Sequence, residues 1–173
     1  MITDNIVQFR LLKEEFKEYP VSGDYRIIHV TKYNYRKYIK ELLNVSELLK
    51  ADIEWDGIPD LTGIQKRFVA NSECFLWYYK SELVGWTWFN ESVSIDWESI
   101  FKLLPSNEVY VGGAFISKKK NLPPSAGFNF YNLCFNSWLR DFNYNKIYLY
   151  SDDWTRASAI LCYRCGFKKH SFL

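Results

Sequence analysis

Four segments in the second half of the chain alternate between strand and helix, and this order limits the folds that the chain can adopt. Val109–Ile116 and Lys146–Ser151 are short apolar runs typical of buried strands. A second helix follows the second strand and ends at Gly166. The order predicts a strand–helix–strand unit, and therefore a sheet with helices packed on it. The first helix has one apolar face, formed by Phe128, Tyr131, Phe135, Trp138, Leu139 and Phe142.

The first half of the chain supplies further strands and helices for the same sheet. We expect the first strand at Asp24–Thr31, followed by a helix in which apolar residues recur from Tyr35 to Leu43. Cys74–Tyr79 and Leu83–Phe89 are aromatic-rich runs joined by a short polar turn, which predicts a β-hairpin. The chain has 173 residues and no low-complexity linker, so we expect a single domain over residues 1–173.

Charge and cysteine usage give no support for a nucleic-acid or membrane partner or for a metal site. The 22 basic and 20 acidic residues give a net charge of +2, which does not favour nucleic acid or an anionic membrane as a partner. There is no basic leader with an apolar run and no membrane-length apolar segment, so we expect a cytoplasmic protein. The four cysteines form no disulfide framework, and Cys162 and Cys165 have no nearby histidine with which to bind a metal.

The last strand and helix carry the most specific pattern. Leu149, Leu161, Gly166 and Phe167 match, in register, the C-terminal motif of the GNAT superfamily of N-acetyltransferases, which this region resembles. The sequence departs from that motif at three positions, which are Thr155 in place of Asn, Ser158 in place of Ala and Cys162 in place of Tyr.

The predicted hairpin extends this resemblance toward the N-terminus. Glu82–Gly85 resembles the turn that joins two strands of the family's sheet, and the resemblance covers about residues 24 to 173. It implies an α/β (α+β) domain with the GNAT-like fold, in which helices flank a mixed central sheet. It also implies acetyl-CoA as co-substrate, with no metal.

The resemblance places the coenzyme between the central strand and the start of the Phe128 helix. The family's phosphate-binding loop falls on Asn121, Pro124 and Ala126, but proline has no N–H to offer to a phosphate. A register shifted by one residue uses Ser125 and Gly127 instead. Lys118–Lys120 precede this loop and either add positive charge or belong to a solvated surface loop. The cofactor contacts that the resemblance implies are Phe115, Ile116, Ser117, Asn121, Ser125, Ala126, Gly127, Phe128 and Thr155.

Two residues are candidates for proton transfer. Glu108 stands where many family members keep a glutamate that serves as base toward the amine, and its alternative role is an exposed carboxylate at the start of a strand. Cys162 stands where the family keeps the tyrosine that protonates the leaving thiolate, and its alternative role is inert packing. The transfer does not strictly need an acid from the enzyme, because water can reach a thiolate.

These patterns lead to one expected function and two alternatives. The resemblance implies direct transfer of acetyl from acetyl-CoA to a primary amine of a small molecule, without a covalent enzyme intermediate. The aromatic residues around Trp77, Trp86 and Trp88 leave room for an amino sugar or a sugar nucleotide as acceptor, and polyamines, amino acids and protein N-termini stay open as alternatives. The alternatives are a non-catalytic binding protein with the same fold and an acyltransferase that uses an acyl-carrier-protein donor. A homodimer formed through an exposed aromatic strand face stays open.

Overall fold

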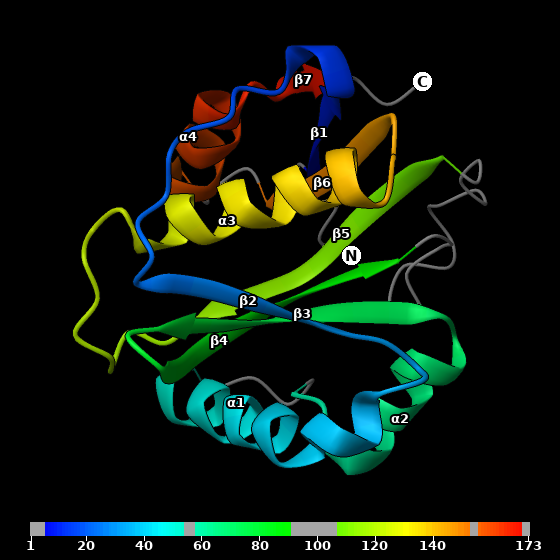
Figure 1. Ribbon diagram of the computed structural model, residues 1–173, viewed down its shortest axis with the longest axis vertical. Coiled ribbons are helices and arrows are strands. Elements are labelled where there is room, and N and C mark those ends of the chain that lie inside the picture. Colours follow the sequence, from blue (N-terminus) through cyan, green and yellow to red (C-terminus); the bar gives the residue numbers. More distant parts are fainter. Residues whose placement is uncertain (1–5, 54–57, 91–106, 153–155, 171–173) are drawn as a thin grey trace.

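The computed structural model describes residues 6–53, 58–90, 107–152 and 156–170, which form one seven-stranded mixed sheet with helices on both faces (Figure 1). The strand order is β2-β3-β4-β5-β6-β1-β7, and all neighbours are antiparallel except the parallel pair β5 and β6. The strands are β1 (Ile6–Leu12), β2 (Tyr25–Val30), β3 (Ser72–Tyr79), β4 (Glu82–Asn90), β5 (Glu108–Ile116), β6 (Lys146–Asp152) and β7 (Lys168–His170). The α-helices are α1 (Ile39–Asp52), α2 (Leu61–Val69), α3 (Ala126–Asn136) and α4 (Arg156–Cys165). The short helices are η1 (Lys13–Glu15), η2 (Tyr35–Tyr38) and η4 (Ser137–Asp141).

Two hydrophobic cores hold the helices on the sheet, and the predicted α/β fold is confirmed. Helix α3 packs on one face of β2–β4, and α1 and α2 pack on the opposite face (Figure 1). On the α3 side, Trp77 and Phe130 stack with ring centroids 5.0 Å apart. On the α1 and α2 side, Phe68 lies 5.1 Å from Trp88. No helix in the described ranges is long and apolar enough to cross a membrane.

The first strand of the sheet is β1, and the expectation that Asp24–Thr31 forms the first strand is wrong. β1 lies between β6 and β7 and pairs with both, although both are distant in sequence. Phe9 and Leu11 are buried on the side of α4, and they alternate with Gln8 and Arg10. This alternation is the sequence signal that identifies the strand.

The segment between β1 and β2 crosses the outer side of α3 and is held there by asparagine side chains. The buried Asn132 accepts a hydrogen bond from the Tyr19 N–H at 3.2 Å and donates one to the Lys17 carbonyl at 3.1 Å. Asn136 donates to a Glu18 carboxylate oxygen at 2.9 Å. These bonds attach the N-terminal part of the chain to α3.

The C-terminal end of α4 explains the Gly-Phe pair of the sequence motif. Gly166 has φ +99° and the Phe167 N–H donates to the Cys162 carbonyl at 3.0 Å, a pairing typical of glycine-terminated helices. A Cβ at Gly166 would lie 2.4 Å from the Glu15 carbonyl oxygen. Glycine therefore both ends α4 and lets it pack against η1.

Candidate active site

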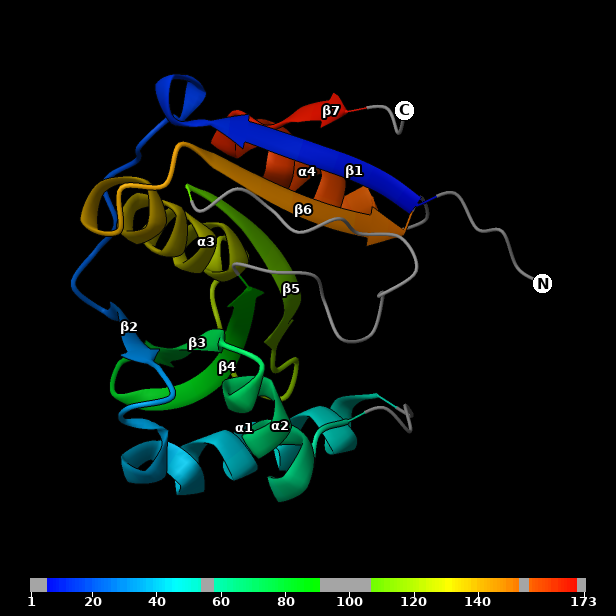
Figure 2. The same cartoon turned by 90° about the vertical axis from the view of Figure 1, so that its right-hand side faces the viewer.

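The two parallel strands at the centre of the sheet separate toward their C-terminal ends. Residues 108–111 of β5 pair with residues 146–149 of β6. Beyond Val111 and Leu149, β5 continues along β4 while β6 continues along β1. Figure 2 shows β5 curving between the two parts of the sheet. Among the described strands, none pairs with the β6-facing edge of β5 from Gly112 to Ile116, so backbone groups on this edge can pair with a ligand.

A β-bulge at Gly113 lies where the separation begins. Thr87 pairs with Ala114 and Trp88 pairs with Gly112, so Gly113 is the extra residue. Its φ is +73°, a conformation that glycine adopts without steric cost. The bulge changes the alternation of the strand, so that Phe115 rather than Ala114 faces the core beneath α1 and α2. It therefore sets the direction of every β5 side chain beside the separation.

Both helices that follow these strands begin at the same end of the sheet. α3 follows β5 and α4 follows β6, and the carboxyl ends of parallel strands are where α/β proteins bind ligands. In α3, the Ala126 N–H donates to the Pro123 carbonyl at 2.9 Å and the Asn129 N–H donates to the Ser125 carbonyl at 3.0 Å. The Gly127 and Phe128 N–H groups lie between them, in the first turn, where a helix offers no internal acceptor. These two donors are suited to an anion.

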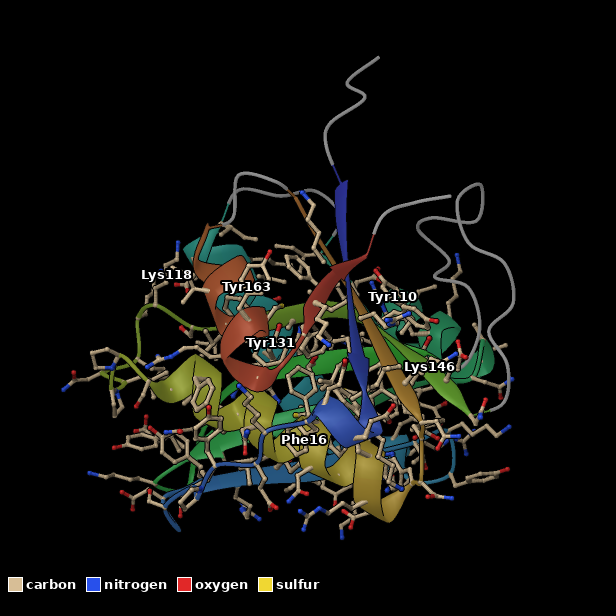
Figure 3. The ribbon with its side chains drawn as sticks, turned by 90° about the horizontal axis from the view of Figure 1, so that it is seen from above. Phe16, Tyr110, Lys118, Tyr131, Lys146 and Tyr163 are labelled. Atoms are coloured by element: carbon tan, nitrogen blue, oxygen red, sulfur yellow. The ribbon has the colours of Figure 1, made fainter. Side chains whose placement is uncertain are left out.

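Lysine side chains add positive charge beside this helix start. Lys118 and Lys119 are exposed and have no ion-pair partner in the described part of the chain, whereas Lys120 lies 3.4 Å from a Glu82 oxygen. The backbone of the segment is fixed, because the Ser117 N–H donates to the Val84 carbonyl at 2.8 Å and the Lys118 N–H donates to Asp52 Oδ2 at 2.7 Å. Figure 3 shows Lys118 on the same side of β1 as α4.

The structure brings most of the predicted cofactor residues to this end of the sheet. Phe115, Ile116 and the buried Ser117 end β5, and Asn121 is exposed in the following loop. Ser125 precedes α3, and Ala126, Gly127 and Phe128 form its first turn. Thr155 lies outside the described residues. The Ala126 N–H is already bonded, so the shifted register with Ser125 and Gly127 leaves more donors free than the register with Pro124 and Ala126.

Glu108 is buried, so the alternative of an exposed carboxylate at the start of a strand is wrong. The residue is 6% exposed and its Oε1 lies 2.6 Å from Lys146 Nζ. Burial, followed by a hydrogen bond to Glu108, raises the pKa of Tyr148 to about 12. Glu108 precedes Val111 by three residues, or about 10 Å of strand, so it lies short of the strand separation.

Cys162 lies in the hydrophobic core between α4 and the sheet. Its side chain is fully buried, and burial together with the neighbouring Cys165 raises its pKa to about 12. The next residue, Tyr163, is 53% exposed and packs edge-on against Phe9 with ring centroids 5.6 Å apart. The surroundings of Cys162 therefore favour a packing role over proton transfer.

Sequence reasoning missed three residues beside the separation. Tyr110, Tyr148 and Arg10 are register partners on β5, β6 and β1. They alternate with buried residues of the α3 and α4 side, and this alternation is the signal that could have identified them.

Three tryptophans belong to the cores, and not to a site for the sugar acceptor for which the aromatic content left room. Trp77 is 1% exposed, Trp86 is 3% exposed and Trp88 is 1% exposed, and all three lie in the two cores. The argument for an amino sugar or sugar nucleotide that rested on these residues is therefore lost.

Comparison with known proteins finds similarity in structure alone. No family model and no curated protein matches the sequence. An aminoglycoside acetyltransferase from an uncultured soil metagenomic sample, in complex with sisomicin, has a TM-score of 0.60 at 11% identity over 87% of this chain and 93% of its own. A putative acetyltransferase from the GNAT family of Novosphingobium aromaticivorans has a TM-score of 0.55 at 10% identity over 96% of this chain and 61% of its own.

A third solved structure contains the coenzyme. The ribosomal-protein alpha-N-acetyltransferase RimL in complex with coenzyme A has a TM-score of 0.52 at 14% identity over 84% of this chain and 80% of its own. Several other matched structures are much longer, and this chain spans about half of their length, with 57%, 48% and 55% of those chains covered. The likeness extends over nearly the whole of the present chain.

Proposed function

Because the chain has the GNAT fold, we propose that it is an acetyl-CoA-dependent N-acetyltransferase that acts on a primary amine of a small molecule. The observation that carries the proposal is the separation of β5 and β6 beside the free N–H groups of α3. A thioester with a long amide-bearing arm and a pyrophosphate has groups that match this edge and this helix start in that order.

The helix start is the place for the pyrophosphate. The N–H groups of Gly127 and Phe128 and the ammonium groups of Lys118 and Lys119 supply donors and positive charge. A Cβ at Gly127 would meet only a Leu161 methyl group at 3.7 Å, an ordinary contact, so packing within the chain does not require glycine there. The absence of a side chain at Gly127 instead allows a ligand to approach the backbone closely.

The face of β5 and β6 that is turned away from α3 and α4 offers a path for the proton that the amine loses. The neutral amine nitrogen attacks the thioester carbon, the C–S bond breaks, and the products are an acetamide and the coenzyme thiol. The proton lost by the amine passes to Glu108 through the Tyr148 hydroxyl, which is hydrogen-bonded to that carboxylate. In this proposal, Glu108 acts through Tyr148 and does not touch the amine.

Water supplies the proton that the leaving thiolate takes up. The pKa of Cys162 is about 12, whereas an ordinary thiol has a pKa of about 8.5. Transfer from Cys162 to the thiolate would therefore be unfavourable. Cys162 is therefore the weaker candidate for the acid.

Calorimetric titration with acetyl-CoA tests the cofactor site. We expect a dissociation constant on the order of micromolar, and weaker binding of 3′-dephospho-CoA if the lysines contact phosphates. The double substitution Lys118→Ala and Lys119→Ala should weaken binding about 3- to 10-fold, with a larger effect at low salt. The matched control is Lys40→Ala with Lys66→Ala, which removes two exposed lysines from α1 and α2.

A screen of amines by thiol release then tests the reaction. Thiol release with formation of an acetamide supports the transferase. Binding of acetyl-CoA without turnover on any amine would favour the non-catalytic binding protein, and absence of binding would favour an acyl-carrier-protein donor or a binding role unrelated to the coenzyme.

A further inference from the structure

A row of polar side chains crosses the sheet next to the strand separation. Tyr110 pairs with Tyr148 across β5 and β6, and Tyr148 pairs with Arg10 across β6 and β1, so the three residues share one face. Val109 and Ile147, their neighbours in sequence, are buried on the opposite face beneath α3 and α4. In Figure 3, Tyr110 and Lys146 lie on the other side of β1 from Tyr163 and α4.

None of the described helices packs on this part of the sheet face. The buried residues beneath α1 and α2 come from β2, β3 and β4, together with the two helices themselves. The α1 and α2 helices therefore cover the half of this face that lies on the other side of β5 from Tyr148 and Arg10 (Figure 2).

Arg10 carries a charge on this face that no described carboxylate pairs with directly, although the Glu15 carboxylate that pairs with Lys168 also attracts it. Lys146 pairs with Glu108, and Lys168 pairs with Glu15. Arg10 forms no ion pair with any described residue, and its Nε is buried without a hydrogen-bond acceptor. A buried donor on a charged group that lacks an acceptor destabilises the folded state, because the desolvation of the donor is not offset. An anion that accepts from Nε would remove this penalty, and the planar guanidinium suits carboxylate and phosphate oxygens.

Arg10 lies two strands away from Tyr110, which is beside the strand separation where the reaction is proposed to occur. The row of Tyr110 and Tyr148 comes one residue before the last paired residues, Val111 and Leu149. Neighbouring strands are about 4.8 Å apart, so the Arg10 backbone lies about 10 Å from that of Tyr110. This is the length of a small molecule with an amine at one end and an anionic group at the other.

We propose that the acceptor is a primary amine that also carries a carboxylate or phosphate group, which Arg10 binds while the half-buried Tyr148 contacts the body of the molecule. This inference rests on the proposed function, because it concerns the acceptor of the same reaction. Arg10 is thus a specificity-determining residue of the acceptor site.

Matched pairs of amines test this inference. 6-Aminohexanoate, which has its amine and its carboxylate at opposite ends, is compared with 6-aminohexanamide to test a carboxylate, and glucosamine 6-phosphate with glucosamine to test a phosphate. We expect kcat/KM for the anionic member of at least one pair to be higher by about 10- to 100-fold, the effect of a charge-assisted hydrogen bond. Arg10→Gln should reduce this ratio to about one and leave acetyl-CoA affinity unchanged. The ratio is measured within one variant, so a loss of folded protein does not affect it.

The control variant is Lys169→Gln, which removes the same charge from an exposed residue on β7 whose register partner, Phe9, is buried on the α4 side. It should keep the preference. Turnover without any preference for the anionic members, or a preference that survives Arg10→Gln, would overturn the inference and leave the proposed function standing.

A second measurement decides the anion site if no amine is acetylated, an outcome that counts against the proposed function. Inorganic phosphate should then raise the unfolding temperature of the wild-type protein more than that of Arg10→Gln. An equal rise in both proteins would overturn the anion site as well.

Discussion

At the scale of single residues, the hydrogen bond between Tyr148 and Glu108 is the contact that links a buried carboxylate to the strand separation. Tyr148→Phe removes only the hydroxyl group. We expect kcat to fall about 100-fold or more near neutral pH, the usual contribution of a positioned proton-transfer group, with unchanged affinity for acetyl-CoA. Glu108→Gln should give a similar loss and should also change the pH profile of kcat.

The control for this prediction is Tyr33→Phe, which removes a hydroxyl from a residue that is 87% exposed. An unaltered kcat and pH profile in both Tyr148→Phe and Glu108→Gln would exclude the pair from proton transfer.

The sequence identified Glu108 as a candidate through the family resemblance. The alternation along β6 indicates which face of the sheet Tyr148 occupies, but its contact with Glu108 depends on the register between β5 and β6, which no local pattern encodes.

At the scale of elements, β1 is the strand whose loss should matter most for stability. Leu11 is fully buried between the sheet and α4, so Leu11→Ala leaves a cavity and should lower the free energy of unfolding by about 3 kcal/mol. Leu61→Ala, at a position that is 43% exposed, should lower it by less than about 1 kcal/mol. Denaturant unfolding of the two variants measures the difference, and similar losses would show that β1 contributes little.

The elements also differ in how far the sequence predicted them. The hairpin of β3 and β4 and the helix α3 follow from local periodicity, and each appears close to its expected range. β1 shows a strand alternation as well, but its partners lie more than a hundred residues away, and local sequence does not say which strands it joins. The bulge at Gly113 depends likewise on pairing with β4, so it could not be predicted from β5 alone.

At the scale of the whole molecule, buried cysteine thiols and a buried tyrosine make the free energy of unfolding decrease at alkaline pH. Burial raises the pKa of Cys162 and Cys165 from 9.0 to about 12, and it also raises that of Tyr131 and Cys134. Below pH 9 both states of the protein keep the thiol protons, so the thiols make no contribution to the pH dependence of stability there. Above pH 9 the unfolded chain loses them first, and stability falls as pH approaches 12.

Unfolding at several pH values between 8 and 11 tests this prediction. Each thiol should contribute a slope approaching 1.4 kcal/mol per pH unit. Cys162→Ala should reduce the slope, whatever its effect on stability at pH 8. A slope that is the same in Cys162→Ala and wild type would show that this thiol ionises equally in both states.

The aromatic content of the sequence left a core and a ligand site as alternative locations for the aromatic side chains, because composition does not say which side chains become buried.

The position of β1 between β6 and β7 has a consequence for the order of events during biosynthesis. β1 leaves the ribosome roughly 140 residues before the β6 residues with which it pairs, and its apolar side chains remain without partners during that time. Contacts between such distant segments slow folding and expose unpaired strands to association with other chains. Until β6 and β7 emerge, association of β1 with other chains therefore competes with its correct pairing.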